Sequence, residues 1–359
     1  MYKYTHFIPQ NIAPKDAKEI GVYDGNGNKV CTIPLGRMTP PSGEPLYSFG
    51  LVSDIHLWST ERDYKPNAKF DNVLTYFENM GCAFCCVSGD LTQTGFYLRT
   101  NENDASTQYW DEAQLAKYKE ICGKHPNLPI YEIAGNHESY YSMALSDTIE
   151  GNALWATYTG INELHYYFEY QNDVFIFCGQ PRGSTPMTDE AFDFLSDTLE
   201  DNSDKRCFIF IHPQFTNDSG NALGAYTSNQ YLDSWGKASE FKGLLNKYRN
   251  AILFHGHSHF MFECQEFDES ANYTNKNGFH SVHIPSLGRT RYITMDYAML
   301  GSQGYIVDVY DDCIVLNGMD FNHTDATAAP VPLGVFKIDT KLQTIAPNTF
   351  TDSTGTITV

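Results

Sequence analysis

The chain has 359 residues, and 42% of them are apolar and 14% aromatic, which is enough to fill a large folded core. It carries 44 acidic and 24 basic residues, so its formal net charge is −20. A field of that sign repels phosphate groups, which argues against a nucleic acid polymer or an anionic membrane as a partner.

Residues 1–45 are predicted to form a small appendage. Residues 18–33 alternate apolar and polar side chains around the Gly- and Asn-rich sequence at 24–28, which is typical of a β-hairpin. Prolines at positions 34, 40, 41 and 45 then predict a stiff linker. The hairpin either packs at the edge of the main sheet or serves in attachment or oligomerisation. No apolar leader and no uncharged apolar run of roughly 18 residues occurs, so we expect a cytoplasmic protein.

Five short apolar runs follow along the chain, and each ends in a polar cluster. These clusters are Asp54-Ile55-His56, Gly89-Asp90, Gly135-Asn136-His137-Glu138, His212 and Gly256-His257-Ser258-His259. Such a run is typical of a buried strand in an α/β sheet, where active sites lie at the C-terminal ends of the strands. Helical patterns at 67–79, 109–122, 188–199 and 234–248 separate the runs, as in a layered α/β fold.

The polar clusters contain the donor groups of a two-metal centre. Carboxylate, amide oxygen and imidazole suit Mn, Fe, Zn or Ni better than a metal that prefers thiolates. Asp90 stands alone in its cluster and is the natural bridge between two ions. Asp54 and His56 are expected to reach one ion from a stretch that has left the strand for a loop. His257 and His259 either share an ion or divide between two, and two such ions can clamp an in-line displacement at phosphorus.

This order of motifs resembles the calcineurin-like metallophosphoesterase superfamily, whose signature is D-x-H, G-D, G-N-H-[DE], H and G-H-x-H. All five motifs are present, in order, between about position 49 and position 288. The resemblance implies an α/β fold, a four-layer α/β/β/α sandwich with two mixed sheets. It also implies a metal-dependent phosphoester hydrolase in which a hydroxide that bridges two metal ions attacks phosphorus in line.

The resemblance assigns roles to individual residues. One metal would be held by Asp54, His56 and His259. The other would be held by Asn136, His212 and His257, with Asp90 bridging the two ions. His137 would lie beside the phosphoryl group and act with Asp90 as a catalytic residue.

Two neighbours of His137 bear on its role. In many relatives an Asp stands three residues after the bridging Asp and orients the catalytic His, but this chain has Gln93 there. An amide does not favour the imidazolium as a carboxylate does, so we expect His137 to act mainly as a hydrogen-bond donor to phosphate. Glu138, where Asp is commoner, is a candidate to replace the missing orienting group.

The substrate class is indicated by the segment at 89–95, which is most similar to the cyclic-nucleotide and small-phosphodiester branch. The chain lacks the Val-Asp-Arg-Gly and Arg-Gly-Asn-His-Glu strings of the protein Ser/Thr phosphatases. A phosphodiesterase with a small substrate is therefore favoured, with a phosphomonoesterase as the alternative. Arg289 and Arg291 follow the last motif and either contact the substrate phosphate or form surface ion pairs.

The remaining polar and aromatic positions divide into possible site residues and packing residues. The polar stretch 92–108 starts beside Asp90 and could form a lid, and Tyr140 and Tyr141 could stack a base but are expected to pack. His255 is expected in the core, and the histidines at 165, 280 and 283 in cross-strand packing. The nine cysteines are odd in number and lack a second C-x-x-C pair, which favours reduced, buried thiols.

Residues beyond the last motif are predicted to be β-rich. A strand is expected at 279–284, a hairpin at 305–316 and a small β extension from 326 onward. We therefore predict an appendage at 1–45, a metallophosphoesterase domain at 46–325 and an extension at 326–359. The two terminal parts also keep open a structural or attachment protein, for example of a viral particle, with a phosphoesterase core.

Overall fold

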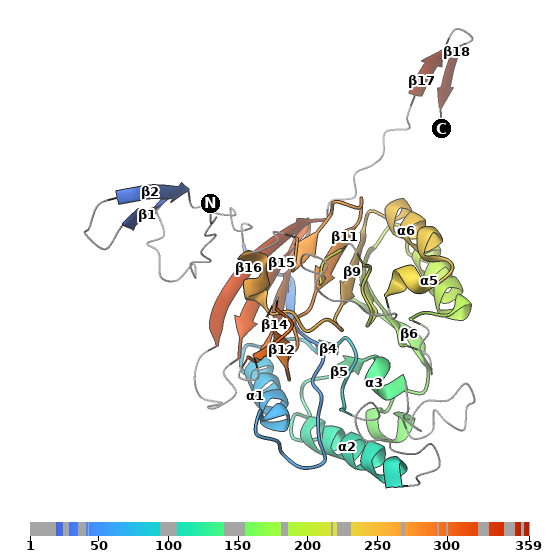
Figure 1. Ribbon diagram of the computed structural model, residues 1–359. Helices are drawn as coiled ribbons and strands as arrows, with labels where there is room; N and C mark the ends of the chain where they lie inside the picture. The colour runs from blue at the N-terminus through green and yellow to red at the C-terminus, as the bar shows by residue number, and fades with distance from the viewer. Residues whose placement is uncertain are drawn as a thin grey trace.

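Two six-stranded mixed sheets face each other in the structure, which is a computed structural model of the chain (Figure 1). The structure describes residues 19–23, 29–34, 41, 43–93, 106–139, 155–180, 186–216, 218–220, 231–266, 270–292, 294–298, 301–321, 330–340, 349–352 and 355–358. The strand orders are β16-β15-β14-β3-β4-β5 in the first sheet and β10-β11-β9-β8-β7-β6 in the second.

The first sheet is parallel on one side and antiparallel on the other. Its parallel strands are β3 (Tyr47–Val52), β4 (Cys85–Val87) and β5 (Ile130–Glu132). Its antiparallel strands are β14 (Gln303–Val309), β15 (Cys313–Asp320) and β16 (Val331–Asp339).

The second sheet has a parallel centre with one antiparallel strand at each edge. The parallel strands are β7 (Asp173–Cys178), β8 (Arg206–Phe210), β9 (Ala251–His255) and β11 (His280–His283). The edge strands are β6 (His165–Tyr170) and β10 (Tyr273–Thr274).

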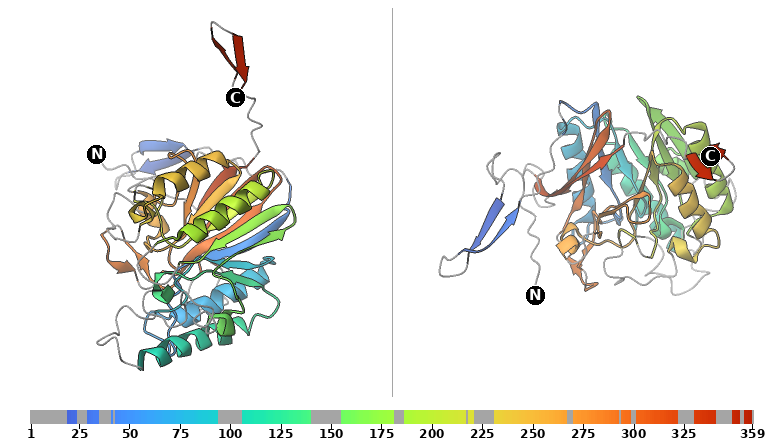
Figure 2. Two further views of the ribbon diagram at one scale, coloured as in Figure 1. Left: turned by 90° about the vertical axis from the view of Figure 1, so that its right-hand side faces the viewer. Right: turned by 90° about the horizontal axis from the view of Figure 1, so that it is seen from above.

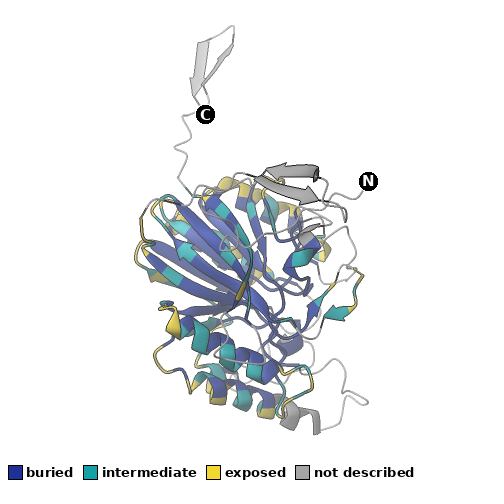
Figure 3. Cartoon of the chain, turned by 90° about the vertical axis from the view of Figure 1, so that its left-hand side faces the viewer, coloured by how far each residue is buried: buried dark blue, intermediate teal, exposed yellow. Residues whose placement is uncertain are grey.

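Helices cover the outer faces of both sheets, as the view from above in Figure 2 shows. Helices α1 (Pro66–Asn79) and α2 (Ser106–Cys122) pack on the first sheet, and α5 (Asp189–Asp201) and α6 (Ala238–Lys247) pack on the second. The four-layer sandwich implied by the resemblance is therefore confirmed. Figure 3 shows the strands largely buried and the helices exposed on their outer sides.

Several shorter elements complete the chain. A single helical turn, α3 (Asn136–Ser139), follows β5, and 3-10 turns occur at Leu232–Ser234 and Phe262–Glu266. Three strand pairs lie outside the two large sheets: β1 (Glu19–Tyr23) with β2 (Lys29–Pro34), β12 (Thr290–Arg291) with β13 (Tyr297–Ala298), and β17 (Thr349–Asp352) with β18 (Gly355–Thr358).

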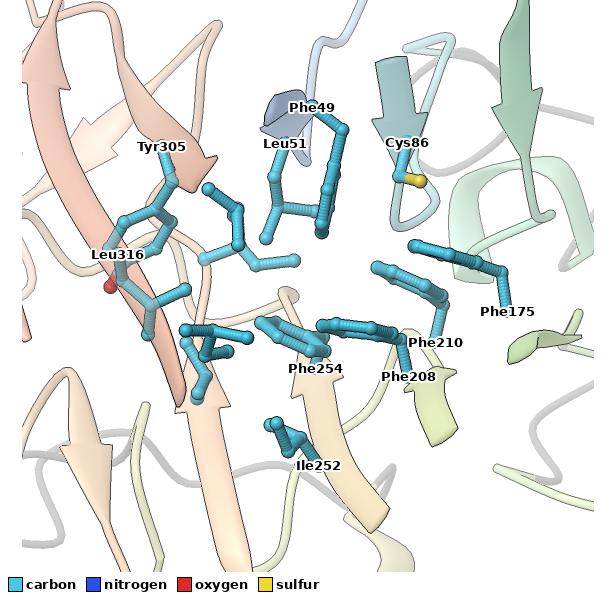
Figure 4. Close-up of a cluster of buried hydrophobic side chains, with 14 of the residues drawn as sticks. Phe49, Leu51, Cys86, Phe175, Phe208, Phe210, Ile252, Phe254, Tyr305 and Leu316 are labelled. Atoms are coloured by element: carbon cyan, nitrogen blue, oxygen red, sulfur yellow. The ribbon is translucent and has the colours of Figure 1, made fainter. Parts of the chain in front are cut away.

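Alternation along the strands creates the layers, because successive side chains of a strand point to opposite faces. In β7, Phe175 lies between the two sheets while its neighbour Ile176 packs under the helices, and in β8 the same holds for Phe208 and Ile209. Figure 4 shows the resulting stack of rings between the sheets. The Phe175 and Phe208 rings lie 4.7 Å apart and nearly parallel. Such pairs contribute roughly 0.5–1.5 kcal/mol beyond the burial of their area.

Local sequence explains where two of the helices begin. Helix α1 starts with Pro66, whose fixed φ suits the first helical position and whose missing N–H would have no partner there. Helix α5 starts after Thr188, whose side chain accepts a hydrogen bond from the Ala191 N–H, and Asp189 and Glu190 stand in its first turn.

Most predicted elements are found with shifted ends. The five apolar runs are the strands β3, β4, β5, β8 and β9. The predicted hairpins at 18–33 and 305–316 are the pairs β1–β2 and β14–β15, whose strands extend beyond the predicted ends. Helix α6 begins four residues later than predicted, because Leu232–Ser234 forms a separate 3-10 turn. Strand β16 pairs with β15 in the first sheet. The division into 1–45, 46–325 and 326–359 stays a prediction. Most of the predicted lid, Tyr140 and Tyr141 lie outside the described residues.

Replacing Phe208 by alanine tests the ring stack as a source of stability. Phe208 is fully buried, so Phe208→Ala should lower the free energy of unfolding by about 3–5 kcal/mol, measured by urea denaturation. Tyr167 on β6 is 48% exposed, and Tyr167→Ala is the control with an expected loss below about 1 kcal/mol. Equal losses in the two variants would contradict the assignment of this layer as the core.

Candidate metal centre

The predicted ligands gather where the strands of both sheets end. Among the described residues, metal-ligating side chains form two overlapping buried groups, whose donor atoms lie within 4.8 Å of one another. One group is Asp54, His56, Asp90 and His259, and the other is Asp90, His212 and His257. Asp90 is common to both, and the two histidines of the last motif divide between the groups.

The first group is centred on His259. Its Nε2 atom lies 3.0 Å from Asp54 Oδ1 and 3.0 Å from His56 Nε2. His56 Nε2 is in turn 3.8 Å from Asp90 Oδ2. Four donor groups from β3, β4 and β9 therefore face a common point.

The second group includes an amide. His212 Nε2 lies 3.2 Å from Asp90 Oδ2 and 3.0 Å from Asn136 Oδ1. The same Asn136 oxygen is 2.8 Å from His257 Nδ1. The structure thus brings Asn136 together with His212 and His257.

The orientation of two imidazoles fits cation binding. His212 Nδ1 lies 2.8 Å from the Ser88 carbonyl and His259 Nδ1 lies 3.0 Å from the Arg289 carbonyl, so each Nδ1 donates its proton outward. In the neutral rings, each Nε2 then presents a lone pair to carboxylate or amide oxygens about 3 Å away. Facing lone pairs repel unless a positive charge lies between them. This donor set therefore fits a dinuclear metal centre.

Electrostatics of the side chains agree with this fit. Burial opposes a charge on His212, but Asp90 and Asp54 outweigh it and raise the pKa of His212 to about 9. Burial likewise raises the pKa of Asp90, but His212 and His137 outweigh it, so the pKa of Asp90 falls to about 2. Burial also opposes a charge on Asp54, but His259 and His212 outweigh it and lower the pKa of Asp54, so both carboxylates stay ionised inside the protein and favour positive charge at this point.

Left-handed backbone conformations let the ligands converge. Positive φ angles occur at Asp54 (51°), His56 (54°), Asp90 (52°), His257 (73°) and His259 (65°). Such conformations cost roughly 1–3 kcal/mol each for residues other than glycine and persist only where the surroundings enforce them. Here, hydrogen bonds from the Asp54 and His56 N–H groups to the Gly89 and Asp90 carbonyls tie the first two loops together. The chain has left the strand before His56, as the sequence argument required.

Two motif glycines are required by close approach. A Cβ on Gly135 would lie 2.3 Å from Asp90 Oδ1, and a Cβ on Gly256 would lie 2.4 Å from Asp54 Oδ2. Each glycine lies against the carboxylate of a different loop. Any larger residue at either position would push a predicted ligand out of the centre.

His137 lies at the edge of the two groups. Its backbone N–H donates to Asp90 Oδ1 over 2.9 Å, and its Nε2 is 3.9 Å from Asp90 Oδ2. Gln93 Nε2 is 3.5 Å from His137 Nδ1, so Gln93 occupies the predicted place beside the ring. Burial lowers the pKa of His137, Arg289 acts in the same direction, and Asp90 only partly opposes them. A neutral ring is what the sequence analysis expected.

Glu138 holds two loops together. Its Oε1 atom accepts hydrogen bonds from the N–H and hydroxyl groups of Thr92, and its Oε2 atom accepts one from the Gly135 N–H. These contacts do not orient the His137 ring, which is the role for which the sequence made Glu138 a candidate. Glu138 instead fixes the loop after Asp90 against the turn that carries Asn136.

The two predicted arginines differ in their surroundings. Arg289 is 8% exposed, and its charge lowers the pKa values of His56 and His137, which places its guanidinium near the centre. Arg291 likewise lowers the pKa of His259, and both guanidinium groups lie over the Tyr297 ring. Arg291, however, donates a hydrogen bond to the Tyr297 hydroxyl. Arg289 is thus the arginine better placed to meet a bound phosphate.

The turn that carries Arg289 is held by residues that the sequence analysis missed. Ser286 Oγ donates to the Asp54 carbonyl and accepts from the Arg289 N–H, each over 2.8 Å. Lys69, which is fully buried, donates to the Gly288 carbonyl over 2.8 Å. The signal for Lys69 was present in the sequence, because it stands four residues before Val73 on the apolar stripe of α1.

The other histidines and the cysteines lie outside the two groups. His255 is buried and hydrogen-bonds with the hydroxyls of Ser219 and Ser281. His280 lies 3.0 Å from the Tyr273 hydroxyl of the adjacent strand, as expected for cross-strand packing. The described cysteines are all free. Within the part of the chain that the structure describes, every helix is too short or too polar to cross a membrane.

Comparison with known proteins identifies the family. The model of the calcineurin-like phosphoesterases matches residues 47–261, more than half of the chain. The chain belongs to this family. Its fold and its buried Asp and His cluster agree, so the protein is a metal-dependent phosphoric ester hydrolase. No curated protein matches the chain.

Two solved structures share the fold of this phosphoesterase. A dimetal phosphatase from Danio rerio is 12% identical with a TM-score of 0.52, and the match covers 81% of this chain and 99% of that one. A purple acid phosphatase from yellow lupin seeds is 13% identical with a TM-score of 0.52, and the match covers 89% of this chain but 59% of that one. At these identities the likeness shows the fold alone.

Metal analysis tests the predicted ligand set. We expect two transition-metal ions per chain, because the two groups share Asp90 but otherwise use separate donors. Asp90→Ala should lower the metal content of both positions, whereas His255→Ala should retain two ions because His255 bonds only to hydroxyls nearby. The measurement is elemental analysis of the purified proteins. Two ions in Asp90→Ala, or an equal loss in His255→Ala, would show that the wrong residues were assigned.

Proposed function

We propose that this phosphoesterase hydrolyses a small phosphodiester at a centre of two transition-metal ions, chosen from Mn, Fe, Zn and Ni. The observation that carries the proposal is the sharing of Asp90 by two buried donor groups, with His137 beside it. The first ion would be held by Asp54, His56 and His259. The second would be held by Asn136, His212 and His257. When bound, two such ions polarise phosphoryl oxygens and make water nucleophilic at neutral pH.

His137 would act beside the phosphate as a hydrogen-bond donor. Its Nε2 faces the side of Asp90 and its Nδ1 faces Gln93, so a ring that carries its proton on Nε2 would direct this N–H group toward the centre. The neutral ring would hydrogen-bond a phosphoryl oxygen, and the imidazolium form would pass its Nε2 proton to a departing alkoxide and return to the neutral ring. The Gln93 side chain supplies no charge, and the hydrogen bond with the Gln93 backbone, which raises the pKa of His137, does not outweigh the effect of burial.

Arg289 would bind the non-reacting part of the phosphate. A guanidinium can donate to two oxygens of one phosphate at once, and such charge-assisted bonds are the strong ones. The turn that carries Arg289 is fixed by Ser286 and Lys69, so the guanidinium loses little freedom when a substrate binds.

A small diester is favoured over other phosphoesters by two features of the sequence. The segment at 89–95 resembles the small-phosphodiester branch, and the net charge of −20 opposes a nucleic acid polymer. The runner-up is a phosphomonoester. Turnover of bis-p-nitrophenyl phosphate, p-nitrophenyl phosphate and cyclic nucleotides by the metal-loaded protein separates these classes. The free cysteines suit a reducing compartment such as the cytoplasm.

Removing His137 should affect substrates according to their leaving groups. An alkyl leaving group needs a proton and an activated aryl group does not, so His137→Ala should slow an alkyl diester by about 10²–10⁴-fold and bis-p-nitrophenyl phosphate far less. Asp90 accepts its hydrogen bond from the backbone N–H of His137, which the variant keeps, so His137→Ala should retain its metal ions. Metal content is therefore measured together with kcat. An equal loss on both substrates with full metal content would argue against proton donation by His137.

Arg289 and Arg291 form a matched pair for a second test. Arg289→Met should lower kcat/KM for bis-p-nitrophenyl phosphate by roughly 10–100-fold, the worth of one or two hydrogen bonds to a charged group. Arg291→Met should have a much smaller effect, because Arg291 is already bound to Tyr297. Both variants should keep their metal ions. A larger loss in Arg291→Met would reverse the two assignments.

A further inference from the structure

A second cavity lies on the outer side of the first sheet, away from the metal centre. It is an open pocket with a volume of about 380 Å³, lined by the end of α2, the turn at 123–128, strand β5 and residues 157–160. Cavities of this size hold small organic molecules. None of the predicted metal ligands lines it. Strand β5 connects the two places, because Asn136 follows it four residues after Glu132.

The wall of the pocket mixes apolar, aromatic and polar side chains, and Glu132 is the carboxylic acid among its lining residues. Leu128, Ile130 and the ring of Tyr118 form an apolar lining, and Glu132 stands among them at the end of β5. Glu132 is 2% exposed, and its Oε2 atom makes no hydrogen bond with any described residue. Burial raises the pKa of Glu132 well above its usual range, although the nearby Tyr118 hydroxyl acts in the opposite direction.

Two basic side chains also line the pocket, and both contact groups other than Glu132. Lys119 Nζ donates to the Thr157 carbonyl over 2.8 Å. The ring nitrogens of His125 lie 2.8 Å from Glu78 Oε2 and 2.9 Å from Asp71 Oδ1. Cys122, a further lining residue, is a thiol whose pKa is raised by burial. Glu132 is therefore a buried acid that has no cationic partner among the described residues and whose Oε2 atom is unpaired there.

A ligand with a positive head would satisfy this group best. Guanidinium and ammonium groups bring both N–H donors and the charge that stabilises a buried carboxylate. The surroundings favour a cation as well, because Asp71, Glu78 and Glu112 lie on the helices nearby and the whole chain is acidic. One cation already lies against an aromatic ring of the pocket, since Lys119 Nζ is 5.9 Å from the centroid of the Tyr158 ring.

We propose that this cavity is a binding site for a small organic cation, a guanidine or an amine, whose head pairs with Glu132 and whose apolar part packs on Leu128, Ile130 and Tyr118. The site is separate from the metal centre and does not depend on the proposed function. A ligand held there contacts β5, the strand that leads to Asn136 and His137.

The test uses the metal-loaded, full-length protein and two probes of equal shape. n-Butylguanidinium is charged and N-butylurea is its neutral counterpart, and binding of each is measured by calorimetry and by the shift in Tm. We expect n-butylguanidinium to bind at least roughly tenfold more tightly than N-butylurea. Absence of binding by n-butylguanidinium at millimolar concentration, or equal binding of both probes, would overturn the proposal.

Variants locate the binding in this cavity. Glu132→Gln keeps the shape but cannot become charged, so it should weaken n-butylguanidinium binding by roughly tenfold or more. Glu200→Gln changes an exposed carboxylate on α5 and should leave the affinity unchanged. If Glu132→Gln does not fold, Ile130→Trp, which narrows the cavity, takes its place and should weaken binding likewise. Unchanged affinity in the folded cavity variant would overturn the proposal.

Discussion

Repulsion among lone pairs is the constraint on which the rest of this structure depends. Nitrogen and oxygen acceptors of His212, Asn136 and Asp90 lie 3.0–3.2 Å apart, and those of His259, Asp54 and His56 lie 3.0 Å apart. In their neutral forms, two of these rings donate their single proton outward to backbone carbonyls, so an added positive charge, a proton as on His212 or a metal ion, is needed to relieve the repulsion. Positive charge at the centre stabilises the arrangement, and the four-layer fold holds the donor atoms in place around that charge.

That arrangement explains why the loops, and not the strands, carry the strain. Successive side chains of a strand point to opposite faces, and the strand ends at a fixed edge of the sheet, so a strand alone fixes the position of a donor atom only approximately. The final approach is made by residues in left-handed conformations, among them Asp90 and His257, and by glycines that let loops touch. Stacked rings between the sheets, such as Phe175 on Phe208, make the edge rigid enough to enforce those conformations. The alternation of side chains along the strands thus produces both the core between the sheets and the rigid edge at which the ligands meet.

Sequence reasoning reached the parts of the molecule that rest on periodicity and on motif order. The five strands before the motifs and the helices between them follow from residue type and position, while the grouping of Asp54 with His259 was implied by the resemblance to the family. It did not predict the role of Lys69. A lysine on the apolar stripe of a helix is expected to be solvated, and its hydrogen bond to the Gly288 carbonyl is evident only in the structure. It also assigned Glu138 to the His137 ring, while the carboxylate accepts from Thr92 and Gly135, because neighbours in sequence on a turn need not face each other. Tertiary contacts between loops from different motifs decided both cases.

Strand β5 shows how alternation also sets the chemistry on the far side of a sheet. Tyr131 packs between the two sheets, so its neighbours Ile130 and Glu132 must face the helices. At most such positions a strand places an aliphatic side chain, as Val87 does on the adjacent strand β4 opposite Glu132. A carboxyl group in that register costs stability unless something pairs with it. Because Ile133 returns to the inner core and Asn136 follows at the sheet edge, the acid and the predicted metal ligand are fixed by one short stretch of backbone. Charge changes at Glu132 therefore occur on the strand that leads to Asn136, one member of the second donor group.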